Sequence, residues 1–150
     1  MAQSLSKIIL HLVFSTKNRT KLILPEFRSE LFAYMAGICS SVQSQAYKIG
    51  GTENHVHIAC SLPRTISVGD LLEKVKSGSS KWIKTKSPRC SSFAWQAGYG
   101  AFSCSQSQLP DLIEYIERQP KHHFAKSFEE ELRDLLKLYD VEYDEKYLWD

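Results

Sequence analysis

The sequence predicts an α+β fold: an antiparallel sheet built in the order β-α-β-β-α-β, with further helices near the C-terminal end. Three observations support this. The chain has 150 residues, 43% hydrophobic and 24% charged, which is typical of one globular domain spanning 1–150. Short apolar stretches with strand character alternate with longer stretches of helical periodicity. The two middle strands are separated by Gly50-Gly51, which favours a tight turn.

The first half of the chain predicts a strand, a helix and a hairpin. Ile8–Ser15 combines apolar, β-branched and aromatic residues and is predicted to be a strand. Pro25 is expected in the first turn of a helix that runs to about Ser44, because a missing N–H costs nothing there. Ala46–Gly50 and His55–Leu62 are predicted to pair as a hairpin. Apolar residues follow helical spacing in the helix at Phe27, Leu31, Tyr34, Met35, Ile38 and Val42.

The middle of the second half predicts a helix, a loop and a strand. Ser67 is expected to cap a helix over residues 68 to 82 or 83, with Asp70 completing a weak capping box. The polar segment Lys84–Ser92 is expected to be a loop, and Gly98–Ser105 alternates like a strand.

Two helices and an acidic tail, about 140–150, complete the chain. Ser107 is expected to cap the helix Leu109–Gln119, which stops at Pro120. The last helix, Phe128–Tyr139, is expected to be capped by the serine before it. The first six elements therefore match a ferredoxin-like (RRM-like) arrangement, an antiparallel sheet with two helices on one face.

Charge is unevenly distributed along the chain. Residues 129–150 carry nine acidic and three basic side chains, so their net charge is −6. Because the whole chain has a net charge of +2, residues 1–128 carry +8. A basic body favours a polyanionic partner, although an ordinary solvated surface explains the same charges.

Cysteine usage and hydropathy favour a cytoplasmic protein with no membrane partner. No two of the four cysteines lie within ten residues of each other, so no zinc-finger spacing is present. Free thiols in a reducing cytosol are the expected state of Cys39, Cys60, Cys90 and Cys104. The apolar run after Lys7 is too short to cross a bilayer, and no other stretch approaches the required length.

His55 and His57 are the sharpest candidate for a chemical site. Side chains two residues apart on a strand point to the same face, so both imidazoles can bind one cation. Val56 and Ile58 then point into the core. The competing interpretation is a pair of surface histidines. Under either interpretation the rings are expected at the surface, in the metal case at the surface of a cleft.

Tyr115 and Gln119 form the second candidate. They lie four residues apart on a predicted helix and therefore share one face. A tyrosine hydroxyl can act as a covalent nucleophile, and a glutamine carbonyl suits Mg²⁺ or Mn²⁺. The competing interpretation is that Tyr115 is a helix aromatic packed on the core.

A basic stretch over residues 74–89 is the third candidate. It contains no acidic residue, and tryptophans lie within it and just after it, at Trp82 and Trp95. Cations bind phosphates and flat aromatic faces stack on unpaired bases, so the stretch is a candidate for DNA binding. A solvated helix face with a core tryptophan is the alternative. The candidate residues are Lys74, Lys76, Lys81, Trp82, Lys84, Lys86 and Arg89.

At GTENHVHIAC the sequence resembles the HUH endonucleases, which carry a histidine–hydrophobe–histidine motif. Within that group it resembles the single-tyrosine transposases of the smallest single-strand insertion sequences and their REP-associated relatives. The agreeing segments are HLVFSTKNR, ISVGDLLEKVKSGSSKWI, WQAGYGAFSCSQSQ and YIERQ. They occur in the right order over nearly the whole chain.

The resemblance implies a role for each candidate. His55, His57 and Gln119 would bind Mg²⁺ or Mn²⁺, and Tyr115 would attack hairpin-bearing single-stranded DNA to form a 5′-phosphotyrosine. The covalent bond keeps the phosphodiester energy, so no nucleotide cofactor is expected. The protein would be a homodimer in which one subunit's tyrosine helix can complete the other's site. The sequence indicates no dedicated base for Tyr115.

Two alternatives remain at this stage. RNA-recognition modules share the same order of elements, so the chain is alternatively a non-catalytic single-stranded nucleic-acid-binding module, although the aromatic strand motifs of those modules are missing. A domesticated relative acting on palindromes in the host genome would have the same chemistry in another biological role. Among the remaining histidines, His11 is interpreted as structural, and His122 and His123 as exposed.

Overall fold

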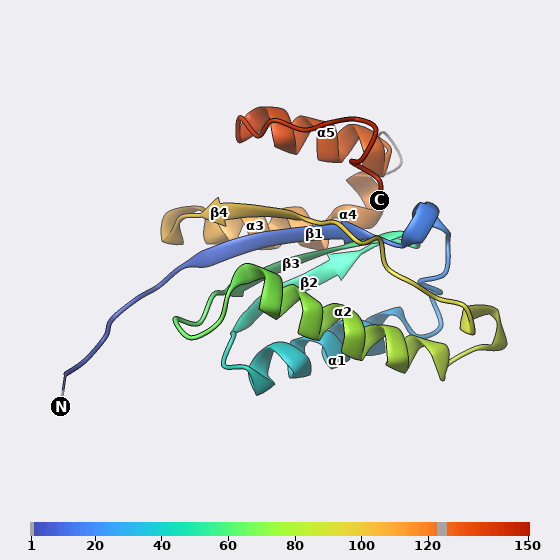
Figure 1. Cartoon of the computed structure of the whole chain (residues 1–150), viewed down its shortest axis with the longest axis horizontal. Coiled ribbons are helices and arrows are strands. Elements are labelled where there is room, and N and C mark those ends of the chain that lie inside the picture. The colour runs from blue at the N-terminus through green and yellow to red at the C-terminus, as the bar shows by residue number, and fades with distance from the viewer. Residues whose placement is uncertain (1, 123–125) are drawn as a thin grey trace.

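A four-stranded antiparallel sheet forms the centre of the protein, as the computed structural model in Figure 1 shows. The structure describes residues 2–122 and 126–150, without the side chain of His122. The strands lie in the order β2-β3-β1-β4, and all neighbours are antiparallel, which confirms the predicted ferredoxin-like order. Their bounds are Ile9–Ser15 for β1, Ala46–Gly51 for β2, His55–Ser61 for β3 and Gly100–Cys104 for β4.

Helices cover both faces of the sheet. On one face lie α1 (Arg28–Ser41) and α2 (Val68–Lys84), as predicted. The other face carries α3 (Leu109–Glu117), the short α4 (Gln119–His122) and α5 (Phe128–Leu138), the added C-terminal helices (Figure 1). Short 3₁₀ helices connect the larger elements: η1 at Lys17–Arg19, η2 at Pro88–Cys90 and η3 at Gln106–Gln108.

Side chains of β1 and β3 alternate between the two faces of the sheet, and each face has a hydrophobic core of its own. Phe14 on β1 and Val56 and Ile58 on β3 are completely buried against α1 and α2, which confirms the predicted orientation of Val56 and Ile58. The alternate residues, such as Val13, pack on the opposite face under α5. Both histidines of β3 lie on this opposite face, because they occupy the alternate positions.

The first helix is shorter at both ends than predicted. Pro25 lies in a turn before α1, in which the amide of Arg28 donates to the Pro25 carbonyl at 3.4 Å. Phe27 has a φ of −123°, outside the helical region, so the regular helix begins only at Arg28. At the other end, Gln43 has a φ of 67°, which ends the helix before the expected Ser44.

The predicted tyrosine helix is divided in two. Ser107 was expected to cap it, but this residue lies inside η3, and Gln108 precedes the helix without a side-chain cap. The helix ends at Glu117 rather than Gln119, and Pro120 lies in the first turn of α4. The proline ring would clash with the carbonyl four residues earlier in a continuous helix, which explains the break.

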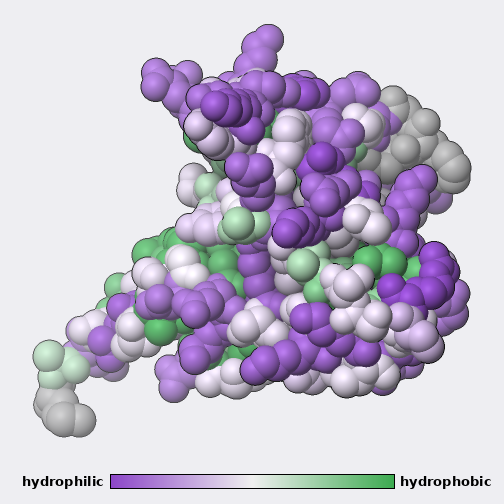
Figure 2. Space-filling view, turned by 45° about the vertical axis from the view of Figure 1, so that its right-hand side comes forward, coloured by the Kyte–Doolittle hydropathy of each residue, from purple (hydrophilic) through white to green (hydrophobic). Residues whose placement is uncertain are grey.

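The last helix is an amphipathic lid over the second face of the sheet. Ser127 caps α5 as predicted, accepting from the Glu130 amide at 3.2 Å. Phe128, Leu132 and Leu136 are buried beneath it. Its outer side and the returning C-terminal segment form the upper layer of Figure 2, which is covered mainly by hydrophilic side chains. The segment is held at its end by a hydrogen bond from the Gly98 amide to the Asp150 carbonyl at 2.8 Å.

Two expectations about the environment of the chain can be compared with the structure. All four cysteines are free thiols, as predicted, and Cys39, Cys60 and Cys90 are buried. Within residues 2–122 and 126–150, none of the helices combines the length and the apolar character needed to cross a membrane.

Gly50 is expected to tolerate no side chain, because β2 and α3 approach closely there. A Cβ at this position would lie 2.8 Å from both Cγ2 and the carbonyl oxygen of Ile116. Gly50→Ala should therefore lower the free energy of unfolding by about 1–3 kcal/mol, measured by urea denaturation. The matched control is Gly37→Ala in α1, where a Cβ meets nothing within 4 Å and roughly 0.5–1 kcal/mol should be gained. Equal effects at the two glycines would contradict this packing argument.

Candidate active site

His55 and His57 point their Nε2 atoms toward the same place beneath α4 and α5. The Nδ1 atom of His55 lies 2.8 Å from Asn54 Oδ1 and 2.9 Å from Thr52 Oγ1. The Nδ1 atom of His57 lies 2.7 Å from Nε2 of His11 on the neighbouring strand. The shared face is as predicted. The rings are completely buried, however, so the expected surface position is wrong, because α4 and α5 cover this face.

Gln119 reaches the histidines from α4. Its Oε1 atom lies 3.0 Å from Nε2 of His55, and its amide nitrogen donates to Oε2 of Glu131 at 2.9 Å. Because only the nitrogen end of the amide can donate to a carboxylate, this bond directs the oxygen end toward His55. Gln119 is completely buried. Although the helix is broken between them, Gln119 and Tyr115 both reach the same carboxylate.

Tyr115 projects from α3 into the same group. Its hydroxyl donates to Oε2 of Glu131, and its ring lies edge-on to His57 with 5.7 Å between the centroids. Burial, followed by the charge and hydrogen bond of Glu131, raises the pKa of Tyr115 well above its ordinary value. The hydroxyl is therefore protonated at neutral pH in this state.

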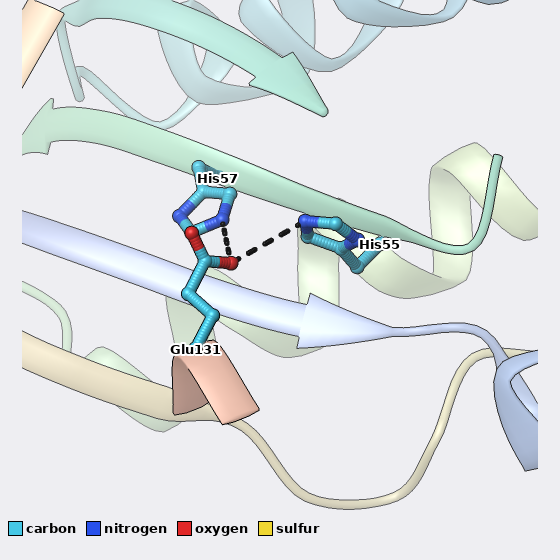
Figure 3. Close-up of side chains that lie close together, drawn as sticks. All are labelled: His55, His57 and Glu131. Carbon is cyan, nitrogen blue, oxygen red and sulfur yellow. Dashed lines mark hydrogen bonds and ion pairs between the residues drawn. The ribbon is translucent and has the colours of Figure 1, made fainter. Parts of the chain in front are cut away.

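Glu131 on α5 is the residue that the sequence reasoning missed. Its carboxylate is 2% exposed, and Oε1 lies 3.0 Å from Nε2 of His57 and 3.5 Å from Nε2 of His55, as Figure 3 shows. A signal for it exists in the sequence. Glu131 lies three residues after Phe128 and directly before Leu132, on the apolar side of an amphipathic helix where a charge is unusual.

The donor atoms fit a divalent cation. One ligand atom from each of His55, His57 and Glu131 lies within 4.8 Å of the others. The Nδ1 atom of His55 is occupied by Asn54 and Thr52, and its Nε2 atom is directed at the oxygens of Gln119 and Glu131. Imidazole nitrogens together with carboxylate and amide oxygens form a donor set used for Mn²⁺ and Mg²⁺.

His11 is a second residue whose place in the site was not predicted. It is 3% exposed, and burial lowers its pKa to about 3, with the His57 charge adding to the shift. Its ring stacks on His57 with 5.0 Å between centroids and meets Tyr115 edge-on at 6.1 Å. A cavity of about 350 Å³ lined by His11, Tyr115 and Tyr139 opens beside the tyrosine.

The basic stretch lies on α2 and in the loop after it, and α2 covers the face of the sheet opposite the histidines. Lys76 is engaged within the chain, donating to the carbonyls of Gln96 and Gly98 at 2.8 and 2.7 Å. Trp95 is a core residue whose indole donates to Ser79, whereas Trp82 is partly exposed beside Tyr34. The exposed cations of the stretch are Lys74, Lys81, Lys84, Lys86 and Arg89, and DNA binding by them stays a prediction.

The prediction that His122 and His123 are exposed cannot be compared with the structure. His123 and the side chain of His122 lie outside the described residues.

Comparisons with known proteins identify the family and similar folds. Residues 4–119 match the family described as "Transposase IS200 like". A crystal structure of a putative transposase from Deinococcus radiodurans R1 is similar, with a TM-score of 0.61 and 19% identity over 79% of this chain and 98% of that one. The REP-associated tyrosine transposase bound to a REP hairpin is also similar, with a TM-score of 0.59 and 13% identity over 82% of this chain and 74% of that one. No curated protein sequence matches the chain. Since the family match covers most of its length, the chain belongs to the IS200-like transposase family.

Proposed function

We propose that this transposase cuts and rejoins single-stranded DNA at hairpin-bearing element ends, with Tyr115 as the nucleophile. The observation that carries the proposal is the convergence of four side chains within one chain. The Tyr115 hydroxyl and the Gln119 amide both contact Glu131, which in turn contacts the Nε2 atom of His57. A nucleophile beside a cation-binding group is the arrangement that phosphoryl transfer requires.

The proposed reaction balances without any cofactor that carries energy. The Tyr115 oxygen attacks phosphorus, and the bond from phosphorus to the 3′ oxygen breaks. This step leaves a 5′-phosphotyrosine and a free 3′-hydroxyl that takes up a proton. Rejoining reverses the step with another 3′-hydroxyl as the attacking group. No nucleotide cofactor is needed, because one phosphodiester bond is exchanged for another.

His55, His57 and Gln119 are the proposed ligands of Mg²⁺ or Mn²⁺, with Glu131 as a fourth. When bound, the cation would neutralise charge on the scissile phosphate and orient it. The side chains have further tasks of their own. Asn54 holds the His55 ring by a hydrogen bond at Nδ1, and Glu131 accepts the hydrogen bond that the Tyr115 hydroxyl donates. Glu131 is therefore the base that the sequence did not indicate.

Access to the site requires movement of its cover. His55, His57 and Gln119 are completely buried in this state, and the Glu131 carboxylate fills the space between them. A DNA phosphate and this carboxylate are both anions, so both can lie at the site only with a cation between them. Because these side chains are buried under α4 and α5, we expect α5 to shift when DNA enters. A cavity of about 350 Å³ opens beside Tyr115.

The proposed partners are hairpin-bearing DNA and a second copy of the chain. The similar REP-associated transposase is bound to a REP hairpin, and this supports hairpin DNA as the class of substrate. A homodimer is proposed from the resemblance of the sequence to single-tyrosine transposases. The four free thiols suit the reducing cytoplasm, which is the proposed place of action.

A covalent-adduct assay tests the proposal. The protein is incubated with hairpin-bearing single-stranded oligonucleotides in Mn²⁺ or in EDTA and separated on a denaturing gel. We expect a protein–DNA adduct that retains a 3′-end label, together with a shortened 5′-labelled strand ending in a 3′-hydroxyl. Binding of the hairpins without any adduct in Mn²⁺ would instead support the non-catalytic nucleic-acid-binding module.

Glu131→Gln is expected to weaken Mn²⁺ binding by about tenfold or more, because it removes the negative charge from the proposed ligand set. Calorimetric titration of the metal-free protein measures the affinity. Gln119→Ala is the matched comparison from the other side of the group and should also weaken binding. If Glu131→Gln binds Mn²⁺ as tightly as the unmodified protein while Gln119→Ala does not, Glu131 is excluded as a ligand and Gln119 is kept.

A further inference from the structure

The cavity of about 350 Å³ beside Tyr115 lies between α3 and the C-terminal end of α5. Leu112 and Tyr115 line it from α3, and Leu135 and Leu138 line it from α5. Its volume is in the range of cavities that bind small ligands, and most of its lining is apolar or aromatic. The proposed reaction uses Tyr115 at the edge of this cavity and gives its interior no role.

The wall on α3 presents polar groups in line with the nucleophile. Gln108, Asp111 and Tyr115 are spaced by three and four residues along α3 and the turn before it, so they follow one face of the helix. Gln108 forms no side-chain cap on α3, and both Gln108 and Asp111 are exposed. An amide and a carboxylate are therefore available to a ligand, and the helix fixes their position relative to the nucleophile.

An aromatic ring also lines the cavity. Tyr139 follows α5 and is 38% exposed, and its ring stacks on Phe102 of β4 with 4.7 Å between the centroids. This stack fixes the plane of the Tyr139 ring, so the ring can support a further flat molecule. Leu138 beside it is 75% exposed, which is apolar surface that such a molecule would cover.

The charges around the cavity favour a base over a phosphate. Its lining among the described residues includes one acidic side chain, Asp111, and no lysine or arginine. A phosphate would be repelled there, because its binding depends on cations. A nucleobase is neutral and flat, stacks on tyrosine, and offers N–H groups to a carboxylate. Since Tyr115 attacks a phosphate in the proposed reaction, the base beside that phosphate is the part of the DNA that lies within reach of the cavity.

We propose that this cavity binds one unpaired base of a nucleotide that flanks the scissile phosphate, with Tyr139 as the stacking surface and Asp111 as the acceptor for the exocyclic amino group of cytosine or adenine. This proposal rests on the proposed function and adds a specificity element to it. A carboxylate accepts hydrogen bonds but donates none, and thymine has no exocyclic amino group, so thymine is disfavoured at this position. A shift of α5 would change the width of the cavity, whereas the spacing of Asp111 from Tyr115 on α3 would be kept.

A scan with hairpin-bearing single-stranded oligonucleotides tests the proposal. Each oligonucleotide carries one abasic position, moved stepwise along the unpaired flank, and its affinity is measured by fluorescence anisotropy in EDTA to prevent metal-dependent cleavage. We expect one position at which loss of the base weakens binding to the unmodified protein by about tenfold, because one base–aromatic stack is removed. In Tyr139→Ala the same abasic position should cause little further loss, because the stacking surface is already absent.

Asp111→Asn tests how the edge of the base is recognised. At the position found in the scan, the unmodified protein should bind cytosine or adenine about tenfold more tightly than thymine. Asp111→Asn should remove most of this preference, because asparagine can donate a hydrogen bond to the thymine O4 atom. Glu114→Gln is the matched control, since Glu114 is an exposed acid of α3 that pairs with Arg118 and does not line the cavity. This control should keep the preference.

The outcomes separate this proposal from the proposed function. A scan in which no abasic position depends on Tyr139 would overturn the proposal, and so would discrimination against thymine that is unchanged in Asp111→Asn. Should Tyr139→Ala not fold, Asp111→Asn decides alone. Adduct formation in Mn²⁺ without any such base position would contradict the base site and keep Tyr115 as the nucleophile. A base position that depends on Tyr139 and Asp111, with no adduct in Mn²⁺, would support the base site and contradict the proposed cleavage.

Discussion

Replacing Tyr115 with phenylalanine is expected to abolish the covalent protein–DNA adduct while leaving DNA binding intact. The phenyl ring keeps the edge-on contacts with His57 and His11, so the surrounding side chains should stay in place. What is lost is the oxygen that attacks phosphorus, and no other atom of the ring can form the phosphotyrosine. Denaturing gels of hairpin-bearing single-stranded DNA with Mn²⁺ measure the adduct, and a mobility-shift assay measures binding.

The same change is also expected to lower the stability of the protein. The Tyr115 hydroxyl donates to the buried carboxylate of Glu131, and phenylalanine cannot replace this hydrogen bond. Loss of a donor to a buried charged group should reduce the free energy of unfolding by about 1–3 kcal/mol. The variant must therefore be shown to be folded, by circular dichroism and by retained DNA binding, before an absent adduct is interpreted.

Tyr99→Phe is the matched control for the nucleophile. Tyr99 is 46% exposed and lies just before β4, in the cavity beside α2 rather than next to the histidines. The adduct should form normally in this variant. Persistence of the adduct in Tyr115→Phe together with its loss in Tyr99→Phe would transfer the nucleophile to Tyr99.

Mixing two inactive variants tests whose tyrosine serves each site. Within one chain Tyr115 lies beside its own His57, so we expect a mixture of Tyr115→Phe and His57→Ala subunits to stay inactive. If tyrosine helices are exchanged in a homodimer, one of the two sites in a mixed dimer carries both native residues. Restored adduct formation in the mixture would therefore demonstrate exchange.

The sheet and its order were predictable because they depend on local patterns. The strand composition of Ile8–Ser15 and His55–Leu62 predicted the central strands. The turn expected at Gly50-Gly51 was wrong, because both glycines are paired within β2 and the chain turns at residues 52–54. Helix ends were less predictable. Pro25 forms a turn of its own, and Pro120 divides a helix that looks continuous in its apolar pattern. A proline is compatible with several local conformations, and contacts distant in the sequence select among them.

The composition of the site was predictable only in part. His55 and His57 share a face because they are two residues apart, and Tyr115 and Gln119 follow from a short motif. The burial of these residues depends on α5, which packs on the sheet through contacts between residues that are far apart in the sequence. Glu131 is separated from His57 by 74 residues and His11 by 46, and neither spacing has a meaning in the sequence alone. The charge on the apolar side of α5 was the one available indication of Glu131.

His57→Ala is expected to eliminate both Mn²⁺ binding and adduct formation. The change removes one of the nitrogen ligands proposed for the cation, and the Nε2 atom of His57 is the one closest to the Glu131 carboxylate, at 3.0 Å. Because the ring is completely buried, the substitution also leaves His11 and Glu131 without their contacts to it. We therefore expect a loss of about 1–3 kcal/mol in the free energy of unfolding, in contrast to the small loss that a histidine at a surface would cause.

His57→Ala is expected to lower stability whether His57 is a metal ligand or only a packed core histidine. The melting temperature in the absence of metal is therefore the same under both interpretations. The shift produced by Mn²⁺ distinguishes them. A bound ligand stabilises the folded state by an amount that reaches about 2.7 kcal/mol at a concentration one hundred times its dissociation constant. The unmodified protein should show this shift, and EDTA should reverse it, whereas His57→Ala should melt at the same temperature with and without Mn²⁺. A full Mn²⁺ shift in His57→Ala would mean that the ring fills space in the core, and the cation would then have to be assigned to other side chains.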